Sequence, residues 1–181
     1  MPLTIYTGNT AAHQVFTQGV GLRPRRRYEV QMGNFAVANN AVTTTALGTG
    51  GAGTCQIIVV HKAAGLGALG HYAGTSDPDE IAQGVLDMVQ ALGGPPVANV
   101  VLAAGESGNS QQQLNYQNGV LARVRTVCPG ASVVWPQPPQ DDVWGACYYL
   151  PLEELVGLRL DSPGDYGNAG HINEGISIHS Y

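Results

Sequence analysis

Two residues of this sequence, Cys55 and His71, have side chains that together can carry out nucleophilic catalysis. A cysteine is intrinsically nucleophilic once ionised, and a histidine within hydrogen-bond reach can remove its proton. The stretch TGGAGTC (49–55) leads into the cysteine through several glycines. Small residues at this place let a substrate come close to the sulfur, together with backbone amides that can stabilise an oxyanion. The pattern predicts a reactive cysteine, with a buried structural cysteine beside a tolerated histidine as the alternative.

The sequence around both residues predicts two neighbouring strands. CQIIVVHK (55–62) is a short apolar run typical of a strand covered on both faces. AAGLGALGHYA (63–73) predicts a turn and then a strand that carries His71. A hairpin of these strands places Cys55 and His71 across from each other, within hydrogen-bond reach or slightly looser. GLGALG (65–70) has a glycine spacing like that of dinucleotide-binding motifs, but it precedes a strand, which excludes that interpretation.

Two further segments predict helices. TSDPDEIAQGVLDMVQALGG (75–94) has a cap at Ser76 or Asp77, Pro78 in its first turn, and a stop at Gly93–Gly94. Its predicted inward face consists of Ile81, Val85, Met88, Val89 and Leu92. The second helix is predicted at 111–128, with an inward face made of Leu114, Val120, Leu121, Val124 and Val127.

The other periodic segments predict strands, and their order indicates the fold class. Strands are expected at 28–38 (with a bulge or bend at Gly33), 41–47, 97–105, 131–137 and within 144–160. This order favours an α/β or α+β fold, a single-domain layered sandwich of mixed β-sheet with two main helices. We expect an N-terminal arm at 1–27, the domain at 28–160, and a flexible C-terminal extension at 161–181.

Composition excludes several classes of protein. Of the 181 residues, 44% are hydrophobic and 12% are charged, which indicates one domain with a sizeable core. The net charge of -5 argues against nucleic acid as the main partner, and the short basic run at 23–27 is typical of a solvated segment. No stretch approaches the roughly 18 apolar residues of a membrane span, so we expect none.

The three cysteines indicate a reducing compartment. Cys55, Cys128 and Cys147 are an odd number without a C-x-x-C pair, so no disulfide framework is expected. The first residues lack the features of a secretory signal, and we expect synthesis in the cytoplasm. Leaderless secretion into a host cell leaves no sequence signal and stays open. Cys128 and Cys147 are predicted to be structural.

The remaining histidines predict no metal site. His61 lies at a strand end and is expected at the surface. His13, His171 and His179 lie in polar segments without the spacing of metal ligands.

The order of motifs along the chain resembles the chemotaxis receptor deamidases (the CheD family) and, more distantly, the catalytic domain of the cytotoxic necrotizing factors. CheD proteins carry T-L-G-x-G-S-C at the nucleophile, and this chain has TGGAGTC, with Thr49 six residues before the cysteine. Their G-x-M-x-H motif is similar to GALGH (67–71), with Leu69 where Met is usual. Weaker similarity extends the match over roughly residues 28–160, through MGNFAVANN (32–40), the helix of 78–92, LAAGES (102–107), LNYQN (114–118) and DDVWGACYYLPLEELVGLRL (141–160).

This resemblance implies a CheD-like fold and a cysteine-dependent protein glutamine deamidase. Cys55 then corresponds to the nucleophile, His71 to its base, and Thr49 to the residue that orients the imidazole. The positions implied for holding the oxyanion or the substrate are Gly53, Thr54 and Ser107. The family needs no cofactor, and its implied partner is a target protein with a reactive glutamine.

The chain also departs from the family pattern. Thr54 replaces the usual serine, YAGTSDP (72–78) lacks the family's M-L-P, and LNYQN lacks its arginine. We interpret these changes as loss of specificity for chemotaxis receptors with a retained catalytic core. Two alternatives use the same fold: a cysteine amidohydrolase or protease acting on a small amide or peptide, and a non-catalytic binding protein.

Overall fold

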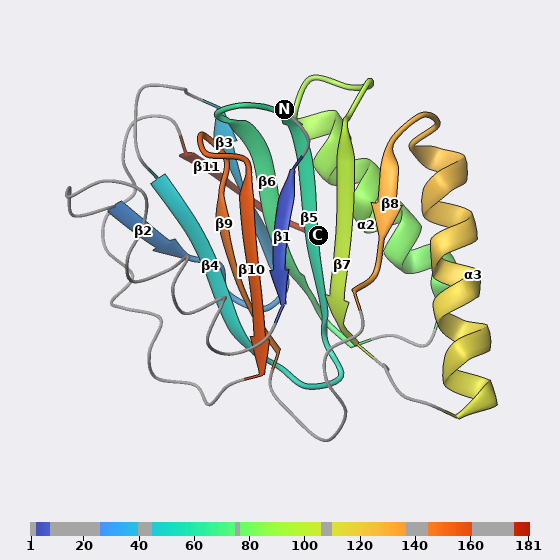
Figure 1. The fold of residues 1–181 in the computed structure, drawn as a ribbon. Coiled ribbons are helices and arrows are strands. Elements are labelled where there is room, and N and C mark those ends of the chain that lie inside the picture. The colour runs from blue at the N-terminus through green and yellow to red at the C-terminus, as the bar shows by residue number, and fades with distance from the viewer. Residues whose placement is uncertain are drawn as a thin grey trace.

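The computed structural model describes residues 3–7, 26–39, 45–74, 77–105, 110–136, 145–160 and 176–181, which form two packed β-sheets and two helices (Figure 1). Sheet A contains, in spatial order, β1 (Thr4–Thr7), β10 (Leu155–Leu160), β9 (Gly145–Leu150), β4 (Thr45–Ala52) and β2 (Arg26–Glu29). Sheet B contains β11 (Ile176–Ser180), β3 (Asn34–Asn39), β6 (Leu66–Tyr72), β5 (Gln56–Ala63), β7 (Asn99–Ala104) and β8 (Ser132–Val134). Both sheets combine parallel and antiparallel pairs, which confirms the predicted α+β sandwich.

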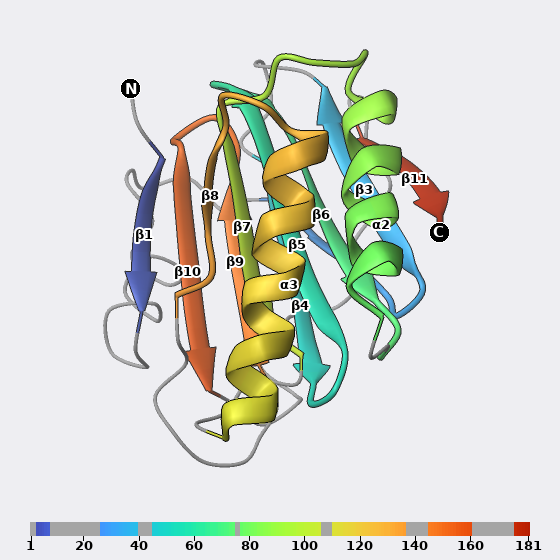
Figure 2. The ribbon, with the colours of Figure 1, turned by 90° about the vertical axis from the view of Figure 1, so that its right-hand side faces the viewer.

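Both predicted helices are present and cover the outer face of sheet B (Figure 2). α2 (Pro78–Ala91) begins after Asp77, whose carboxylate accepts a hydrogen bond from the N–H of Asp79 at 2.9 Å. α3 (Gln111–Val127) begins at a capping box between Ser110 and Gln113. These caps satisfy N–H groups that the first turn leaves free. The two helices lie side by side and start at the same end of the sandwich (Figure 2).

Alternation along the central strands of sheet B produces two separate cores. Ile58 and Val60 of β5 face the helices, where they pack with residues such as Val85 and Met88 of α2. Ile57 and Val59 face sheet A instead. Odd-numbered positions of β5 and β6 therefore point into the space between the two sheets, and both Cys55 and His71 have odd numbers.

The strand predicted at 28–38 is wrong as a single element. Its residues form β2 in sheet A and β3 in sheet B, joined by a turn in which Gly33 adopts φ +82. This left-handed conformation is the one that glycine adopts without strain, and it lets the chain reverse between the two sheets.

The two terminal regions also differ from the prediction. Thr4–Thr7, expected in a loose arm, pairs in parallel with β10. Ile176–Ser180, expected in a flexible extension, pairs antiparallel with β3, so the extension is wrong for these residues. Isoleucine at alternate positions of ISIHS favours a strand, and the open edge of β3 provides its partner.

The glycine-rich stretch before Cys55 carries the chain from sheet A to sheet B. It belongs largely to β4, whose pairing with β9 is irregular between Thr49 and Ala52. Gly51 adopts φ +71 within this irregularity. The chain then bends through Gly53 and Thr54 and enters β5. Thr49 is thus fixed on sheet A, whereas Cys55 stands at the start of a strand of sheet B.

Candidate active site

Cys55 and His71 lie on the same face of sheet B, at the same end of two paired strands. β5 and β6 form the predicted antiparallel hairpin, with Gln56 opposite Tyr72 and Ile57 opposite His71. Cys55 directly precedes β5 and packs, partly exposed, at the border of the core between the sheets. It is therefore a diagonal neighbour of His71, the relationship that lets long side chains on one sheet face reach each other.

The imidazole of His71 is held by a hydrogen-bond chain from the opposite sheet. Oγ1 of Thr49 donates to the carbonyl of Val30 at 2.8 Å. Nδ1 of His71 lies 2.8 Å from Oγ1 of Thr49. A hydroxyl has one proton to donate, so this oxygen must accept from Nδ1–H. The bond places the proton on Nδ1 and leaves Nε2 with a free lone pair.

Nε2 of His71 is buried and, among the described residues, has no hydrogen-bond partner. His71 is only 4% exposed, and burial lowers the pKa of its imidazole. The neutral form is therefore favoured, with its basic nitrogen unoccupied. A buried polar atom without a partner is unfavourable in a purely structural residue, and a catalytic role is one explanation for it.

Within the described part of the chain, the sulfur of Cys55 makes no hydrogen bond to His71. Its contact is with Sδ of Met32, at 3.6 Å. Met32 is 62% exposed although it is a large apolar side chain. The expected contact between Cys55 and His71 stays a prediction: the two residues share a face and an end of the hairpin, and the thiol contacts Met32.

The backbone around Cys55 is anchored on one side and free on the other. Its carbonyl accepts a hydrogen bond from the N–H of Gly105 at 2.7 Å. A side chain at position 105 is not tolerated, because a Cβ would lie 2.5 Å from Oε1 of Gln56 and φ is +73. Within the described ranges, the N–H groups of Thr54 and Cys55 donate to no backbone carbonyl. Backbone N–H groups at such a place are of the kind that can stabilise an oxyanion.

The structure places the other sequence-predicted site residues as follows. Gly53 and Thr54 are exposed beside Cys55, and open space surrounds the α-carbon of Gly53 where a side chain would be. Ser107 lies outside the described residues. Sequence reasoning missed Val30, Met32 and Gly33, all in the turn between β2 and β3. The segment MGNFAVANN (32–40) resembles the CheD family, but nothing in it gives these residues a place at the site, which they reach only through the pairing of strands distant in sequence.

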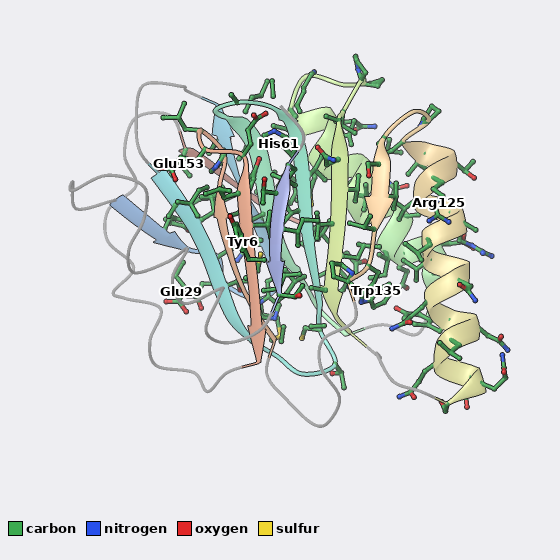
Figure 3. All side chains as sticks on the ribbon, viewed as in Figure 1. Tyr6, Glu29, His61, Arg125, Trp135 and Glu153 are labelled. Atoms are coloured by element: carbon green, nitrogen blue, oxygen red, sulfur yellow. The ribbon has the colours of Figure 1, made fainter. Side chains whose placement is uncertain are left out.

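A second buried polar cluster connects the two sheets at the other end of β5. His61 was expected at the surface, but it is 1% exposed and points into the space between the sheets. Figure 3 labels it at the upper end of β5. Its Nδ1 lies 2.5 Å from the hydroxyl of Tyr149, and its Nε2 lies 3.1 Å from Oε1 of Glu154. The prediction was wrong because a hairpin turn of sheet A, which carries Glu154, covers this strand end.

Charge and burial decide the protonation of this cluster. Burial lowers the pKa of His61, and the hydrogen bond from His61 lowers the pKa of Glu154. Glu154 is therefore a carboxylate that accepts from Nε2–H, while Nδ1 accepts from the phenol of Tyr149. Burial also raises the pKa of Tyr149, so the phenol keeps its proton. Gly67 leaves space for this phenol, since a Cβ there would lie 1.8 Å from the oxygen.

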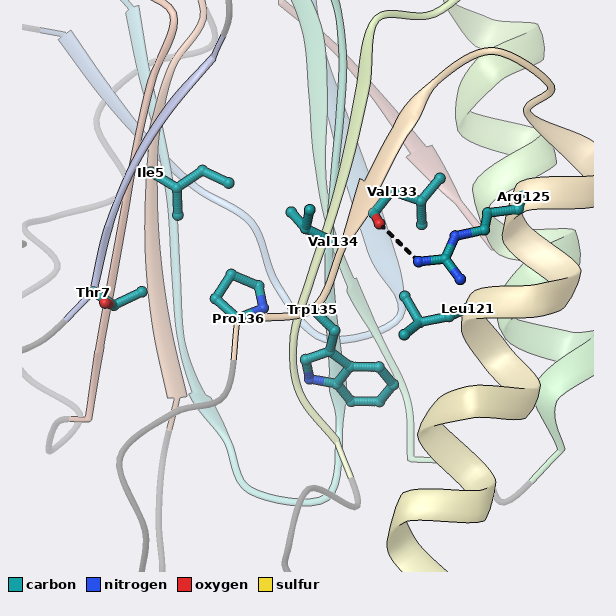
Figure 4. A pocket seen from close by; sticks show the side chains of 8 residues that line it. All are labelled: Ile5, Thr7, Leu121, Arg125, Val133, Val134, Trp135 and Pro136. Carbon is teal, nitrogen blue, oxygen red and sulfur yellow. Dashed lines mark hydrogen bonds between the residues drawn. The ribbon is translucent and has the colours of Figure 1, made fainter.

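A separate pocket of about 470 Å³ lies between β1 and the β8–α3 region (Figure 4). One wall carries Arg125, whose guanidinium donates to the carbonyl of Val133 at 3.4 Å. The full lining is Ile5, Thr7, Leu121, Arg125, Val133, Val134, Trp135 and Pro136. Because Cys55, His71 and Thr49 are not among these residues, we assign the pocket no part in the chemistry at Cys55.

Comparisons with known proteins leave the resemblance to the CheD family untested, because no protein-family model and no curated protein matches the chain. Among the described residues, no group of three His, Cys, Asp or Glu side chains is placed to hold a metal ion. None of the helices in the described part of the chain has the length and apolar character needed to cross a membrane.

Proposed function

We propose that this protein is a cysteine-dependent glutamine deamidase that acts on side chains of a partner protein. The observation that carries the proposal is the unoccupied, buried Nε2 of His71 on the same face as Cys55. A tautomer fixed through Thr49 and a neutral imidazole are what a general base for a thiol requires. The substrate class rests on the resemblance of TGGAGTC and GALGH to the CheD motifs.

In the proposed mechanism, Nε2 of His71 takes the proton of the Cys55 thiol. The thiolate then attacks the carbon of the glutamine carboxamide, and the resulting oxyanion is held by backbone N–H groups at Thr54 and Cys55. When the C–N bond breaks, Nε2–H gives its proton to the leaving nitrogen, which departs as ammonia. Water, deprotonated by the same Nε2, hydrolyses the thioester, leaving glutamate and restoring the thiol.

The exposure of the site fits a substrate that is itself part of a protein. Gly53, Thr54 and Met32 are exposed around the sulfur. A glutamine side chain presented from the surface of another molecule can approach such a site without entering a deep cavity. Neither a metal nor a cofactor takes part in this scheme, and addition of a chelator should leave the rate unchanged.

The test is incubation of the full chain with candidate target proteins, followed by intact-mass analysis and an ammonia assay. A deamidated target stays in one piece and gains the mass difference between glutamine and glutamate. Cys55→Ser and His71→Ala should each abolish this change, whereas Cys128→Ala, a buried cysteine away from the site, should retain it. Cleaved products would indicate a protease instead, and full activity of Cys55→Ser would overturn the mechanism.

A further inference from the structure

The chain ends on a strand that reaches back to the candidate site. β11 pairs antiparallel with β3, and Ser180 stands opposite Asn34 at the end of this ladder. The next residue, Tyr181, therefore lies beside the turn between β2 and β3. Its N–H donates to the carbonyl of Gly33 at 3.1 Å.

The ring of Tyr181 occupies a slot between sheet B and α2. Its centroid lies 5.1 Å from that of Phe35 and 4.6 Å from that of Tyr72, both on sheet B. Its hydroxyl donates to Sδ of Met88, on α2, at 3.2 Å. Such edge-on and tilted aromatic contacts are favourable beyond the area they bury.

Two glycines create this slot. A Cβ on Gly70 of β6 would lie 1.7 Å from the hydroxyl oxygen of Tyr181. A Cβ on Gly84 of α2 would lie 3.2 Å from its ring and 2.9 Å from that of Tyr72. Glycine inside a helix or strand is unfavourable by itself, so its presence in both elements facing one ring indicates a site built for that ring.

The turn that Tyr181 contacts also touches all three residues proposed for catalysis. The N–H of Gly33 donates to the carbonyl of His71 at 2.8 Å, and Tyr181 binds the other side of the same glycine. The carbonyl of Val30 accepts a hydrogen bond from the hydroxyl of Thr49, and the sulfur of Met32 contacts the sulfur of Cys55. Four consecutive residues (30–33) thus connect Tyr181 to the site.

We propose that Tyr181 is a positioning residue: with its ring in the Gly70–Gly84 slot, it holds the turn at 30–33 and thereby keeps His71 in the tautomer that can accept a proton from Cys55. The proposal rests on the proposed function for the identity of the reaction, but not for the geometry. When the slot is empty, the turn loses the support of this ring and keeps the bonds of Val30 to Gly48 and of Gly33 to His71. The carbonyl of Val30 then shifts, and Nδ1 of His71 loses its fixed acceptor.

The experiment compares Tyr181→Ala with Tyr181→Phe and with a control on the same strand, Ile178→Ala. Phenylalanine keeps the ring and the backbone N–H, while Ile178 is 39% exposed and is not among the residues that form the slot. The first readout is the rate at which iodoacetamide modifies Cys55 between neutral and alkaline pH. The second is the ¹⁵N chemical shifts of the His71 imidazole, which report the tautomer directly.

We expect Tyr181→Ala to slow alkylation at neutral pH by roughly 3- to 30-fold, the range of couplings carried through a packed network. At alkaline pH, where thiols ionise without a base, its rate should approach that of the unchanged protein. Its His71 shifts should indicate a mixture of tautomers. Tyr181→Phe and Ile178→Ala should behave like the unchanged protein in both measurements. If Tyr181→Ala does not fold, Tyr181→Leu, which fills part of the slot, should give an intermediate rate.

A lowered melting temperature for Tyr181→Ala, with unchanged alkylation and unchanged His71 shifts, would show that the strand only closes the edge of sheet B, and would overturn the proposal. A wrong assignment of the reaction would give a different result from a wrong positioning role. If no target is deamidated while Tyr181→Ala still alters the His71 tautomer, the positioning role stands and the assignment of the reaction is wrong.

Discussion

Nδ1 of His71 and Oγ1 of Thr49 lie 2.8 Å apart across the interface between the two sheets, so the imidazole of one sheet is oriented by the other. Thr49 is fully buried, and its own proton is committed to the carbonyl of Val30. The orientation of the proposed base therefore depends on how the two sheets are packed, and not on β6 alone.

Two replacements of Thr49 test the contribution of its hydroxyl separately from that of its side-chain volume. Thr49→Val keeps the volume but leaves Nδ1–H and the carbonyl of Val30 without their partner, which should lower the free energy of unfolding by about 1–3 kcal/mol. Alkylation of Cys55 at neutral pH should slow as well. Thr49→Ser keeps the hydroxyl and should be milder in both respects. Urea unfolding and iodoacetamide labelling of the two variants test this; equal rates for valine and serine would show that the hydroxyl does not orient the imidazole.

Stability should fall as the solution becomes mildly acidic. Burial lowers the pKa of both His71 and His61, so the unfolded chain binds protons at these sites before the folded chain does. Their contribution is complete above the ordinary histidine pKa of about 6.5 and is lost as pH falls through the lowered folded-state values. In His71→Asn the side-chain amide can still donate to Thr49 but does not titrate. The urea midpoint of this variant should depend less on pH than that of the unchanged protein; identical slopes would contradict the assignment.

Alkylation should be selective among the three cysteines. Burial raises the pKa of the Cys128 and Cys147 thiols, and both side chains are almost inaccessible. Cys55 is partly exposed and shares a sheet face with His71, its proposed base, so one equivalent of iodoacetamide should modify it first. Peptide mapping after short exposure gives the order. Modification of Cys128 or Cys147 at the same rate in the folded protein would exclude a thiol of raised reactivity at position 55.

Met32 should control access to the sulfur of Cys55. Its thioether lies 3.6 Å from that sulfur, so removal of the side chain in Met32→Ala should expose the thiol and speed its alkylation by small reagents. Met32→Leu preserves an apolar side chain of similar size and should stay near the original rate. Because Met32 is 62% exposed, neither change should alter the melting temperature much. A slower rate in Met32→Ala would instead indicate that the thioether assists the thiol.

The same substitution should have opposite effects in the two helices. In Gly119→Ala of α3 the new methyl group makes an ordinary contact with Pro78, at 3.4 Å, so better helix propensity should stabilise the protein by roughly 0.5–1 kcal/mol. In Gly84→Ala of α2 the methyl group meets the ring of Tyr72 at 2.9 Å, and overpacking should destabilise by about 1–3 kcal/mol. Thermal melts of both variants test the pair, and stabilisation by both would show that the Tyr72–Tyr181 region repacks freely.

The elements with strong local signals were predictable from the sequence. The cap and apolar face of α2, the position of α3 with Val120 and Val124 inward, and the hairpin of β5 and β6 follow from periodicity and turn chemistry within each segment. An exception is Gln117, which α3 buries although it is polar. The period of the helix places position 117 on the inward face, and the polar character of glutamine does not change that position.

The division of strands between two sheets was not predictable. Gly33 indicates a bulge or bend within residues 28–38, but no local signal shows that the chain passes there from one sheet to the other. The same limit explains His61 and Tyr181, because their hydrogen-bond partners Glu154 and Met88 each lie 93 residues away along the chain. For the candidate site, Cys55 and His71 came from residue chemistry and spacing and Thr49 from the resemblance to the CheD motif, whereas Val30 and Met32 emerge only once β2 is placed beside β4.

Polar contacts cross the core between the sheets near opposite ends of the hairpin, from His71 to Thr49 at one end and from His61 to Tyr149 and Glu154 at the other. The apolar side chains between them, such as Ile57, Val59 and Leu69, attract without direction and tolerate small displacements. Hydrogen bonds do not, because each is lost when its atoms shift by about an ångström. Polar contacts at two well-separated places therefore fix both the position and the rotation of sheet A relative to sheet B. A redesigned core of equal volume without them should therefore remain compact while losing a unique alignment of its two layers.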